Sequence, residues 1–199
     1  MGLISLTDCG LYCREGDFYI DPWKPVHRAV ITHAHSDHAR WGSKLYFAHD
    51  DSRDLLKARL GTDINIETAP YGGGFQSNGV QVTLHPAGHI IGSAQIAVTH
   101  KGETWVASGD YKTENDGLTP QFEPVPCNTF ITESTFGLPI YSWKSQPELM
   151  EDIHHWVQRN QSVGRYSVLS AYSLGKAQRL VYGLFPYGYH FYVHGAIYN

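Results

Sequence analysis

The 199-residue sequence predicts an α/β protein, and three observations support this fold class. Short runs rich in β-branched and aromatic residues, separated by Gly and Pro, recur between residues 18 and 134 and predict strands. The clearest signal is 93–110, where two such runs flank His-Lys-Gly-Glu and predict a hairpin, since Gly102 can take a positive φ. After residue 145, helical patterns alternate with apolar runs, and this order predicts a β-α-β unit with parallel strands.

The first two thirds of the chain are expected to consist mainly of strands. Strands are predicted at 18–23, 28–32, 44–48, 79–87, 93–110 (as the hairpin) and 129–134. One helix is expected over 51–61, with Asp51 or Ser52 as its N-cap and Gly61 as its end.

The last third has a different pattern. A helix is predicted over 145–160, because Ser145 is a suitable N-cap and Pro147 suits the first turn. The β-α-β unit follows, with a strand at 166–172, a helix at 173–184 and a strand at 189–194.

Composition and charge narrow the class of protein. Hydrophobic residues make up 42% and charged residues 17%, and no apolar stretch approaches the roughly 20 residues that span a bilayer. The net charge of −4 does not indicate a general nucleic-acid binder. All 19 acidic residues lie in 1–152, whereas 153–199 hold four cations and no acid. Such a cationic segment suits an anionic ligand, although a solvated surface would have the same composition.

The cysteines indicate a compartment. Cys9, Cys13 and Cys127 are few and odd in number, which favours free thiols in a reducing environment and predicts a cytoplasmic protein. Cys9 and Cys13 could form half of a zinc site, but no second cysteine pair follows them. The N-terminus lacks the basic start and the long apolar core of a signal peptide.

The segment 31–40, ITHAHSDHAR, concentrates side chains that bind metals. His33, His35, Asp37 and His38 come directly after a predicted buried strand, and imidazole and carboxylate are usual ligands of zinc, manganese and iron. In an extended chain residues 33 and 35 point the same way, whereas Asp37 and His38 approach from another side after a turn. One loop can therefore offer two ligands to each of two metals, and a merely histidine-rich surface loop is the weaker interpretation.

Two downstream residues have a similar context. His89 lies in a glycine-flanked turn between predicted strands, and Asp110 ends the second strand of the hairpin. Alone, a loop histidine indicates little, and an aspartate after a strand is usually a turn former. Together with the first cluster, and in this order, both become candidate metal ligands.

These motifs resemble a known family. THAHSDHA (32–39) matches the His-x-His-x-Asp-His signature of the metallo-β-lactamase superfamily, and Asp21 resembles its strand-end aspartate. The stretches HIIGSAQ, SGDYK and ITESTFG resemble the β-CASP nucleases within that superfamily. DPWKPVHRAVITHAHSDHARWGS and SAYSLGKAQRL are most similar to its bacterial branch, which is described as ligase-associated DNA exonucleases or mRNA 3′-end processing factors.

The resemblance implies a fold and a division into domains. The expected fold is an αββα sandwich whose loops at one edge hold two divalent metal ions, zinc or manganese. Residues 1–142 would form an incomplete metallo-β-lactamase domain, and 143–199 would form the first part of an inserted β-CASP α/β domain.

The resemblance also implies roles for residues. Two metals about 3.5–4 Å apart can bind a phosphodiester from both sides and share a hydroxide nucleophile. The first metal would be bound by His33, His35 and His89, the second by Asp37 and His38, and Asp110 would bridge them. The expected catalytic residues are Asp37, Asp110 and Glu133, and the expected phosphate contacts are Ser134, Thr135, Ser173 and Lys176.

The implied function is that of a metal-dependent nuclease, with a ligase-associated DNA exonuclease as the first choice and an RNA-processing nuclease as the alternative. A DNA ligase is then an expected functional partner. A metallohydrolase for small esters, thioesters or lactams shares the metal motifs, but it would lack the inserted domain. A non-catalytic scaffold is a third alternative, against which the complete first signature argues.

One part of the family pattern is missing. The family closes its second metal site with a histidine beyond the inserted domain, and the chain ends inside the expected β-α-β unit. His194, which ends a predicted strand, is a weak substitute for that ligand. We therefore expect a fragment with an incomplete second metal site, little nuclease activity alone and exposed strand edges that favour association with another chain.

Overall fold

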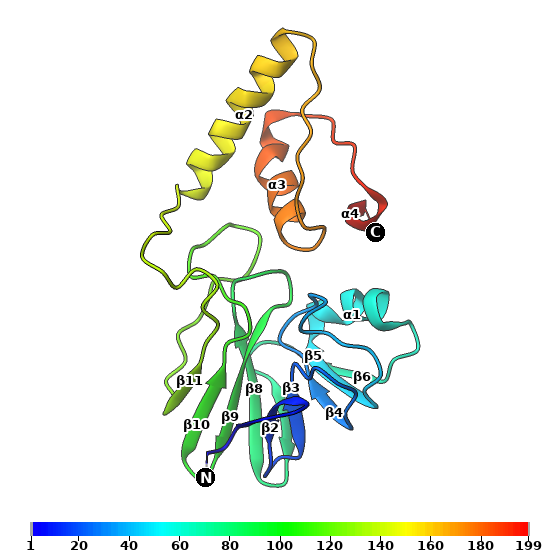
Figure 1. The fold of residues 1–199 in the computed structure, drawn as a ribbon, viewed down its shortest axis with the longest axis vertical. Coiled ribbons are helices and arrows are strands. Elements are labelled where there is room, and N and C mark those ends of the chain that lie inside the picture. Colours follow the sequence, from blue (N-terminus) through cyan, green and yellow to red (C-terminus); the bar gives the residue numbers. More distant parts are fainter. Residues whose placement is uncertain (1, 199) are drawn as a thin grey trace. The chain divides into compact units, whose positions relative to one another are not determined.

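The computed structural model describes residues 2–198, which divide into two compact units after Glu133. The first unit contains two β-sheets and the helix α1 (Figure 1). The boundary expected between residues 142 and 143 separates two family domains, which need not coincide with these compact units, and it stays a prediction.

The first sheet has six strands in sequential order, β1 to β6. β1, β2 and β3 pair antiparallel, whereas β3, β4, β5 and β6 pair parallel. Their bounds are β1 Ser5–Thr7, β2 Gly10–Cys13, β3 Phe18–Ile20, β4 Arg28–Val30, β5 Leu45–His49 and β6 Ile66–Ala69.

The second sheet has five strands in the order β11-β10-β9-β8-β7. Its neighbours pair antiparallel except β10 and β11, which are parallel. Their bounds are β7 Gly74–Ser77, β8 Val80–Pro86, β9 Ala94–His100, β10 Glu103–Ala107 and β11 Thr129–Ile131.

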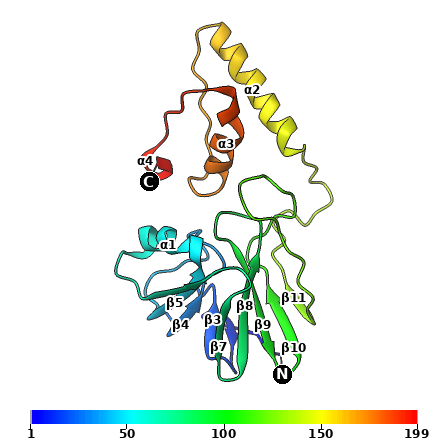
Figure 2. The ribbon, with the colours of Figure 1, turned by 180° about the vertical axis from the view of Figure 1, so that it is seen from behind.

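The core of the first unit lies between the two sheets. Phe18, Val30 and Phe47 from the first sheet belong to the same buried cluster as Val82 and Ile96 from the second. Because side chains alternate along a strand, each sheet turns one apolar face inward. The result is the two-layered β-sandwich that Figures 1 and 2 show from opposite sides.

Most of the expected strands of the first unit are confirmed. The hairpin is formed by β9 and β10, and Lys101 and Gly102 both have positive φ at its turn, with values of 49° and 84°. The strands β1, β2, β6 and β7 were not predicted. They have only three or four residues each and their residues are largely half-exposed or exposed, so their apolar pattern is weak.

The helix α1 (Arg53–Leu60) follows a short 3₁₀ helix, Asp50–Ser52. Ser52 is the N-cap residue of α1, as expected, but its side chain makes no capping hydrogen bond. The Ser52 hydroxyl donates instead to the Gly92 carbonyl at 2.9 Å. The 3₁₀ turn starts the helical segment early, so the side-chain cap is made by His49, which accepts the Asp51 N–H at 3.2 Å. Gly61, with a φ of 118°, ends α1 as predicted.

In the second unit, α2 (Gln146–Ser162) begins as the sequence predicts. Ser145 accepts the Glu148 N–H, and the Glu148 side chain accepts the Ser145 N–H, so the two form a capping box with Pro147 in the first turn. The helix α3 (Lys176–Leu184) is also confirmed, and the short helix α4 (Gly195–Tyr198) lies near the end of the described chain.

The strands expected at 166–172 and 189–194 are wrong. Both stretches are irregular, and the second unit contains no strand within its described residues 134–198. Parallel strands gain stability only from a neighbour, and short isolated pairs are marginal in water. The β-rich composition of these stretches therefore does not produce a sheet here.

Two further expectations can be compared with the structure. Cys9, Cys13 and Cys127 are free thiols, as predicted. No helix within residues 2–198 has both the length and the apolar character needed to cross a membrane.

We predict that Gly92→Ala destabilises the first unit by about 2 kcal/mol or more. Gly92 has a φ of 75°, and a Cβ would lie 2.4 Å from Ser52 Oγ and 2.7 Å from its backbone nitrogen. Gly72→Ala is the matched control, because Gly72 has a φ of 77° and open space around it. Urea unfolding should show the larger loss for Gly92→Ala, and equal losses would exclude a steric role for the close approach to Ser52.

Candidate metal centre

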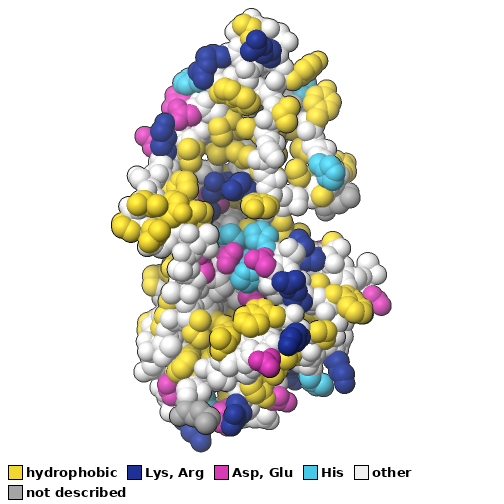
Figure 3. Space-filling view, viewed as in Figure 1, with side chains coloured by type: hydrophobic (Ala, Val, Ile, Leu, Met, Phe, Trp, Pro, Cys, Tyr) yellow, Lys and Arg dark blue, Asp and Glu magenta, His cyan; other side chains and the backbone are white. Residues whose placement is uncertain are grey.

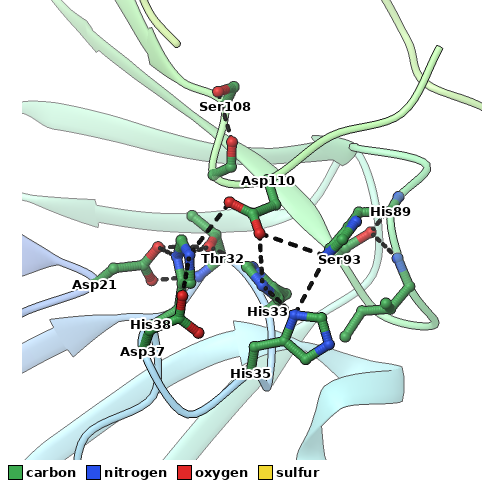
Figure 4. A network of polar contacts seen from close by, with 12 residues as sticks. Asp21, Thr32, His33, His35, Asp37, His38, His89, Ser93, Ser108 and Asp110 are labelled. Carbon is green, nitrogen blue, oxygen red and sulfur yellow. Dashed lines mark hydrogen bonds and ion pairs between the residues drawn. The ribbon is translucent and has the colours of Figure 1, made fainter. Parts of the chain in front are cut away.

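The expected ligands gather at one edge of the β-sandwich (Figure 4). Asp21 follows β3, and the segment 32–38 follows β4, so both lie at carboxyl ends of parallel strands. His89 follows β8 and Asp110 follows β10, two strands that run in the same direction on either side of β9. The antiparallel hairpin thus brings both residues to the same end of the second sheet.

Four side chains form a compact cluster. His33 Nε2 lies 3.0 Å from His35 Nδ1 and 3.7 Å from Asp110 Oδ2. His89 Nε2 lies 3.3 Å from His35 Nδ1 and 3.5 Å from Asp110 Oδ2. These four ligand atoms all lie within 4.8 Å of one another.

The cluster fits a divalent metal ion. Zinc–nitrogen bonds of 2.0–2.1 Å in a tetrahedral site separate neighbouring ligand atoms by about 3.3 Å. The four separations given above, 3.0–3.7 Å, are close to that value, and all four ligand atoms lie within 4.8 Å of one another. Three imidazoles and one carboxylate form a donor set that suits zinc, and manganese or iron as well, so the residues alone do not select one metal.

Asp21 and Thr32 determine which ring nitrogens face the cluster. Asp21 accepts hydrogen bonds from the Thr32 N–H at 2.8 Å and from the Thr32 hydroxyl at 2.5 Å. The hydroxyl has then used its only proton, so it accepts from His33 Nδ1–H at 3.1 Å. His33 Nε2 is thereby left with its lone pair directed into the cluster, as a metal ligand requires.

His38 lies beside the cluster and is fixed in the same way. Its Nδ1 donates to Asp21 Oδ2 at 2.7 Å, so its Nε2 faces Asp110 Oδ1 at 3.3 Å and Asp37 Oδ2 at 3.7 Å. Asp110 therefore directs one oxygen toward each group of ligands (Figure 4). The role of Asp110 as a bridging ligand stays a prediction, for which one carboxylate oxygen is available on each side.

The loops that carry His89 and Asp110 are held by close packing. Ser93 Oγ accepts the N–H groups of His89 and Ile90, both at 3.1 Å, and so closes the turn around His89. Gly109 has a φ of 57°, and a Cβ there would lie 2.6 Å from Thr32 Oγ1. The loop before Asp110 can approach Thr32 only because residue 109 has no side chain.

Burial keeps two of the clustered histidines neutral. Burial lowers the pKa of His33 well below its ordinary value, and the neighbouring histidines lower it further. Burial also lowers the pKa of His89 to about 4, against a smaller opposing effect of Asp110. Neutral imidazole is the form that binds metal, so neither residue has to lose a proton first at neutral pH.

His38 has the opposite charge state. Burial opposes its protonation, but hydrogen bonds to Asp110 and Asp21 outweigh burial and raise its pKa to about 10. The hydrogen bond from His38 in turn lowers the pKa of Asp110. In the metal-free protein, a protonated His38 therefore supplies a positive charge between two carboxylates.

The other expected site residues are distributed between the two units. Glu133 lies after β11 and lines a pocket of 470 Å³ together with Asp37, His38 and Asp110. On the first unit, Figure 3 shows histidine and acidic side chains gathered at the surface. Ser134, Thr135, Ser173 and Lys176 belong to the second unit, and their contact with substrate stays a prediction.

Lys176 and His194, two residues of the second unit with predicted roles, lie at the starts of helices. Lys176 begins α3, as expected, and its ammonium lies 5.5 Å from the centre of the Tyr172 ring. His194 precedes α4 and accepts the Ala196 N–H at 3.1 Å. This contact gives His194 a local structural role.

Sequence reasoning did not identify Thr32 and Ser93 as parts of the site. Both lie inside recognised motifs, THAHSDHA and HIIGSAQ, but their hydroxyls act only through residues that folding brings close. The one available signal was that each small hydroxyl residue lies next to or near a candidate ligand, which is common for turn residues.

Comparisons with known proteins agree with this geometry. No protein-family model matches the chain. A probable DNA ligase from Opitutus terrae is 32% identical over 178 residues, which are 88% of this chain and 17% of that protein. The endoribonuclease YSH1 of Candida glabrata is 29% identical over 77% of this chain and 21% of its own length. An RNase J-like protein of Methanocaldococcus jannaschii is 26% identical over 88% of this chain and 47% of its own length.

A solved structure shares the fold. It is that of an Enterococcus faecalis V583 protein of unknown function, with a TM-score of 0.51 and 10% identity. The match covers 78% of this chain and 44% of that chain, so the likeness concerns the fold alone.

The β-sandwich with a cluster of histidine and aspartate side chains at one edge is a metallo-β-lactamase fold, as expected from the motifs. The chain belongs to the β-CASP branch of the metallo-β-lactamase superfamily, and its curated relatives include the endoribonuclease and RNase J-like proteins. The chain spans between 17% and 47% of the length of the three relatives named above.

We predict that the metal-free protein loses stability as the pH rises from about 6.5 to about 10. His38 binds its proton more tightly in the folded state, since its pKa rises from 6.5 to about 10. Its contribution is therefore complete below pH 6.5 and is lost as the pH passes the folded pKa. Urea unfolding at a series of pH values, after chelation and dialysis, measures this loss.

Asp21→Asn tests whether the proton on His38 causes this loss of stability. It removes one of the two carboxylates that hold the His38 proton, so the decline in unfolding free energy should be shallower. Cys13, whose pKa is raised by burial, adds a decline only above about pH 9 and does so in both proteins. An identical decline in parent and variant would show that Asp21 does not hold the proton.

Proposed function

We propose that the complete protein is a metal-dependent phosphodiesterase that cleaves nucleic acid. The observation that carries the proposal is the convergence of His33, His35, His89 and Asp110 within 4.8 Å, with Asp37 and His38 on the other side of Asp110. Two adjacent sites that share a carboxylate suit two ions acting on one phosphodiester.

The residues have distinct proposed roles. His33, His35 and His89 would hold one ion, Asp37 and His38 a second, and Asp110 both. When bound, such ions supply Lewis acidity to phosphoryl oxygens and lower the pKa of an attacking water. The second site has three protein ligands in the described chain and is proposed to be incomplete in it, with water in the remaining positions.

Two carboxylates are available to move protons. Asp37 is 71% exposed, so its second oxygen can accept a hydrogen bond from the water that attacks. Glu133 lines the same pocket after the end of β11 and would protonate the leaving oxygen. Asp110 would hold its position through His38, whose ring is fixed by Asp21.

The substrate proposed first is DNA, cleaved from an end. Support comes from the match to a probable DNA ligase over 88% of this chain, at 32% identity. RNA is the second candidate, because other relatives have the names endoribonuclease YSH1 and RNase J-like protein. End-labelled single-stranded and double-stranded DNA and RNA, incubated with the complete protein and either zinc or manganese, decide between them.

The second unit is proposed to contact the substrate phosphates. Lys176 at the start of α3 would act through its ammonium, with the positive end of the helix dipole beside it. Ser134, Thr135 and Ser173 would donate hydroxyl hydrogen bonds. Residues 153–199 contain no acid, which favours such contacts. We propose accordingly that 1–142 are metallo-β-lactamase domain and 143–199 the start of a β-CASP insert.

The proposed setting is cytoplasmic, since free thiols are typical of a reducing compartment. A DNA ligase is the proposed functional partner. Little nuclease activity is proposed for the 199-residue chain alone, because its second site has only Asp37, His38 and Asp110 as candidate ligands. Association through exposed strand edges is not proposed again, since the described residues 134–198 contain no strand.

We predict that His89→Ala removes most of the bound metal. His89 supplies one of four ligand atoms in the compact cluster, and a direct ligand should cost at least about 100-fold in affinity. Metal content per chain after dialysis against a mild chelator measures the effect. His100→Ala is the control, because His100 lies in β9 and contacts the Gly79 carbonyl. Full metal content in the His89 variant would exclude it as a ligand.

We also predict that Asp37→Ala and Asp110→Asn each reduce phosphodiester cleavage by about 100-fold or more. Both carboxylates lie next to His38, and Asp110 also belongs to the compact cluster. Asp63→Asn, at an exposed position after α1, is the control for loss of one negative charge. Cleavage at the parental rate by either variant would refute the two-metal proposal.

A further inference from the structure

Two loops beside the metal centre present tryptophan side chains to solvent. Trp23 is 54% exposed in the loop 21–27, and Trp41 is 74% exposed in the loop 38–44. A single exposed apolar residue needs no explanation, whereas two exposed tryptophans on neighbouring loops offer two aromatic faces to a ligand.

Both loops are held rigidly against each other. The Lys44 N–H donates to the Val26 carbonyl at 3.0 Å, and the Leu45 N–H donates to the His27 carbonyl at 3.0 Å. The Tyr46 hydroxyl donates to the Arg40 carbonyl at 2.8 Å. The aromatic side chains are therefore carried on ordered backbone, which lowers the entropy lost when a ligand binds them.

Apart from Asp21, which begins the loop 21–27 and accepts hydrogen bonds from Thr32 and His38, the charged side chains of the two loops are basic. Residues 22–36 and 38–49 contain no acidic residue. Lys24, Arg40 and Lys44 are exposed on the two loops. Figure 3 shows Lys and Arg side chains among hydrophobic ones on the first unit, close to the histidine and acidic side chains. This surface suits an anionic ligand that also offers apolar faces.

The loops also share a pocket with the metal centre. Trp23 and Arg40 line the 470 Å³ pocket whose other wall includes Asp37, His38 and Asp110. A ligand that contacts Trp23 therefore has another part within reach of the candidate metal ligands.

We propose that Trp23, Trp41 and Arg40 form a stacking platform that holds the unpaired bases of single-stranded nucleic acid beside the metal centre. Nucleic acid combines the two features that the loops require, since it has apolar base faces and a regularly charged backbone. Tryptophan rings stack on bases of any sequence, and arginine pairs with phosphate. The proposal rests on the proposed nuclease function and adds the form of substrate that the site takes.

A single strand fits this surface better than a duplex. In a duplex each base face is covered by its neighbours, so a tryptophan ring can stack only on an unstacked or terminal base. A platform next to the metal centre would therefore position a strand that is already unpaired.

The test measures binding separately from cleavage. The complete protein is stripped of metal with a chelator, and its affinity for labelled oligothymidine is measured at several salt concentrations. Trp23→Leu and Trp41→Leu should each weaken binding roughly five-fold or more. Trp23→Phe and Trp41→Phe should retain most of the affinity, because the phenyl ring of Phe can stack on a base and the side chain of Leu cannot. Trp143→Leu is the matched control, a 60% exposed tryptophan in the second unit.

Two further measurements separate stacking from charge. An oligonucleotide with abasic sites should bind the parent as weakly as oligothymidine binds the Leu variants. The Leu variants should bind the abasic oligonucleotide and oligothymidine with the same affinity. Arg40→Ala should flatten the salt dependence, because a lost phosphate contact releases fewer counterions, whereas the Trp→Leu variants should keep the parental slope. Unfolding free energies close to the parent's establish that these exposed substitutions leave the fold intact.

The outcomes distinguish the platform from the proposed function. If the parent binds and cleaves nucleic acid but the Leu variants bind oligothymidine with parental affinity, the platform is refuted and the nuclease proposal stands. If the metal-loaded parent cleaves no nucleic acid while the stripped protein still requires Trp23 and Trp41 to bind it, the platform stands and the nuclease proposal fails. Parental binding of the abasic strand would also refute stacking.

Discussion

The candidate metal centre depends on the carboxylate of Asp21. It accepts hydrogen bonds from the backbone and the hydroxyl of Thr32 and from Nδ1 of His38, and so it fixes the tautomers on both sides of the site. Asp21 has a φ of 43°, a left-handed conformation that aspartate tolerates better than most residues but that still costs free energy. Its hydrogen bonds to a buried hydroxyl and a charged imidazole offset that cost.

The electrostatics around this carboxylate divide the candidate ligands into two kinds. His33 and His89 are kept neutral by burial, whereas His38 holds a proton between Asp21 and Asp110. Two carboxylates close to one edge of an apolar sandwich would repel each other without a positive charge nearby. The proton on His38 supplies that charge in the metal-free protein, and a bound cation would replace it.

Much of the site could be predicted because its residues follow a general rule. His33, His35, His89 and Asp110 each follow a strand with a clear apolar pattern, and such ends meet at one edge of a sheet. Thr32 and Ser93 could not be assigned roles from the sequence. The hydroxyl of Thr32 acts through Asp21, which is distant in sequence, and the hydroxyl of Ser93 acts through the conformation of a turn. The same limit explains Ser52, whose expected partner was its own helix and whose actual partner is Gly92, 40 residues away.

The fold was predicted least well where strands lack partners or strong patterns. The segments 166–172 and 189–194 have the composition of strands but form none, since pairing needs a neighbour as well as propensity. By contrast, β1 and β2 form despite half-exposed residues, because β3 offers them a ladder. Local composition thus indicates a capacity for strand formation, and the surrounding sheet decides whether it is realised.

The candidate ligands come from both layers of the sandwich, and this has a mechanical consequence. His33 and His35 extend from the first sheet and His89 and Asp110 from the second, and at this edge the Ala94 N–H already joins the layers through the Thr32 carbonyl at 2.8 Å. A bound cation would act as a crosslink between layers that are otherwise joined mainly by apolar packing. Any sliding of one sheet over the other would then strain the bonds between metal and ligands. The free energy that resists sliding of the sheets and the free energy of metal binding would therefore be coupled.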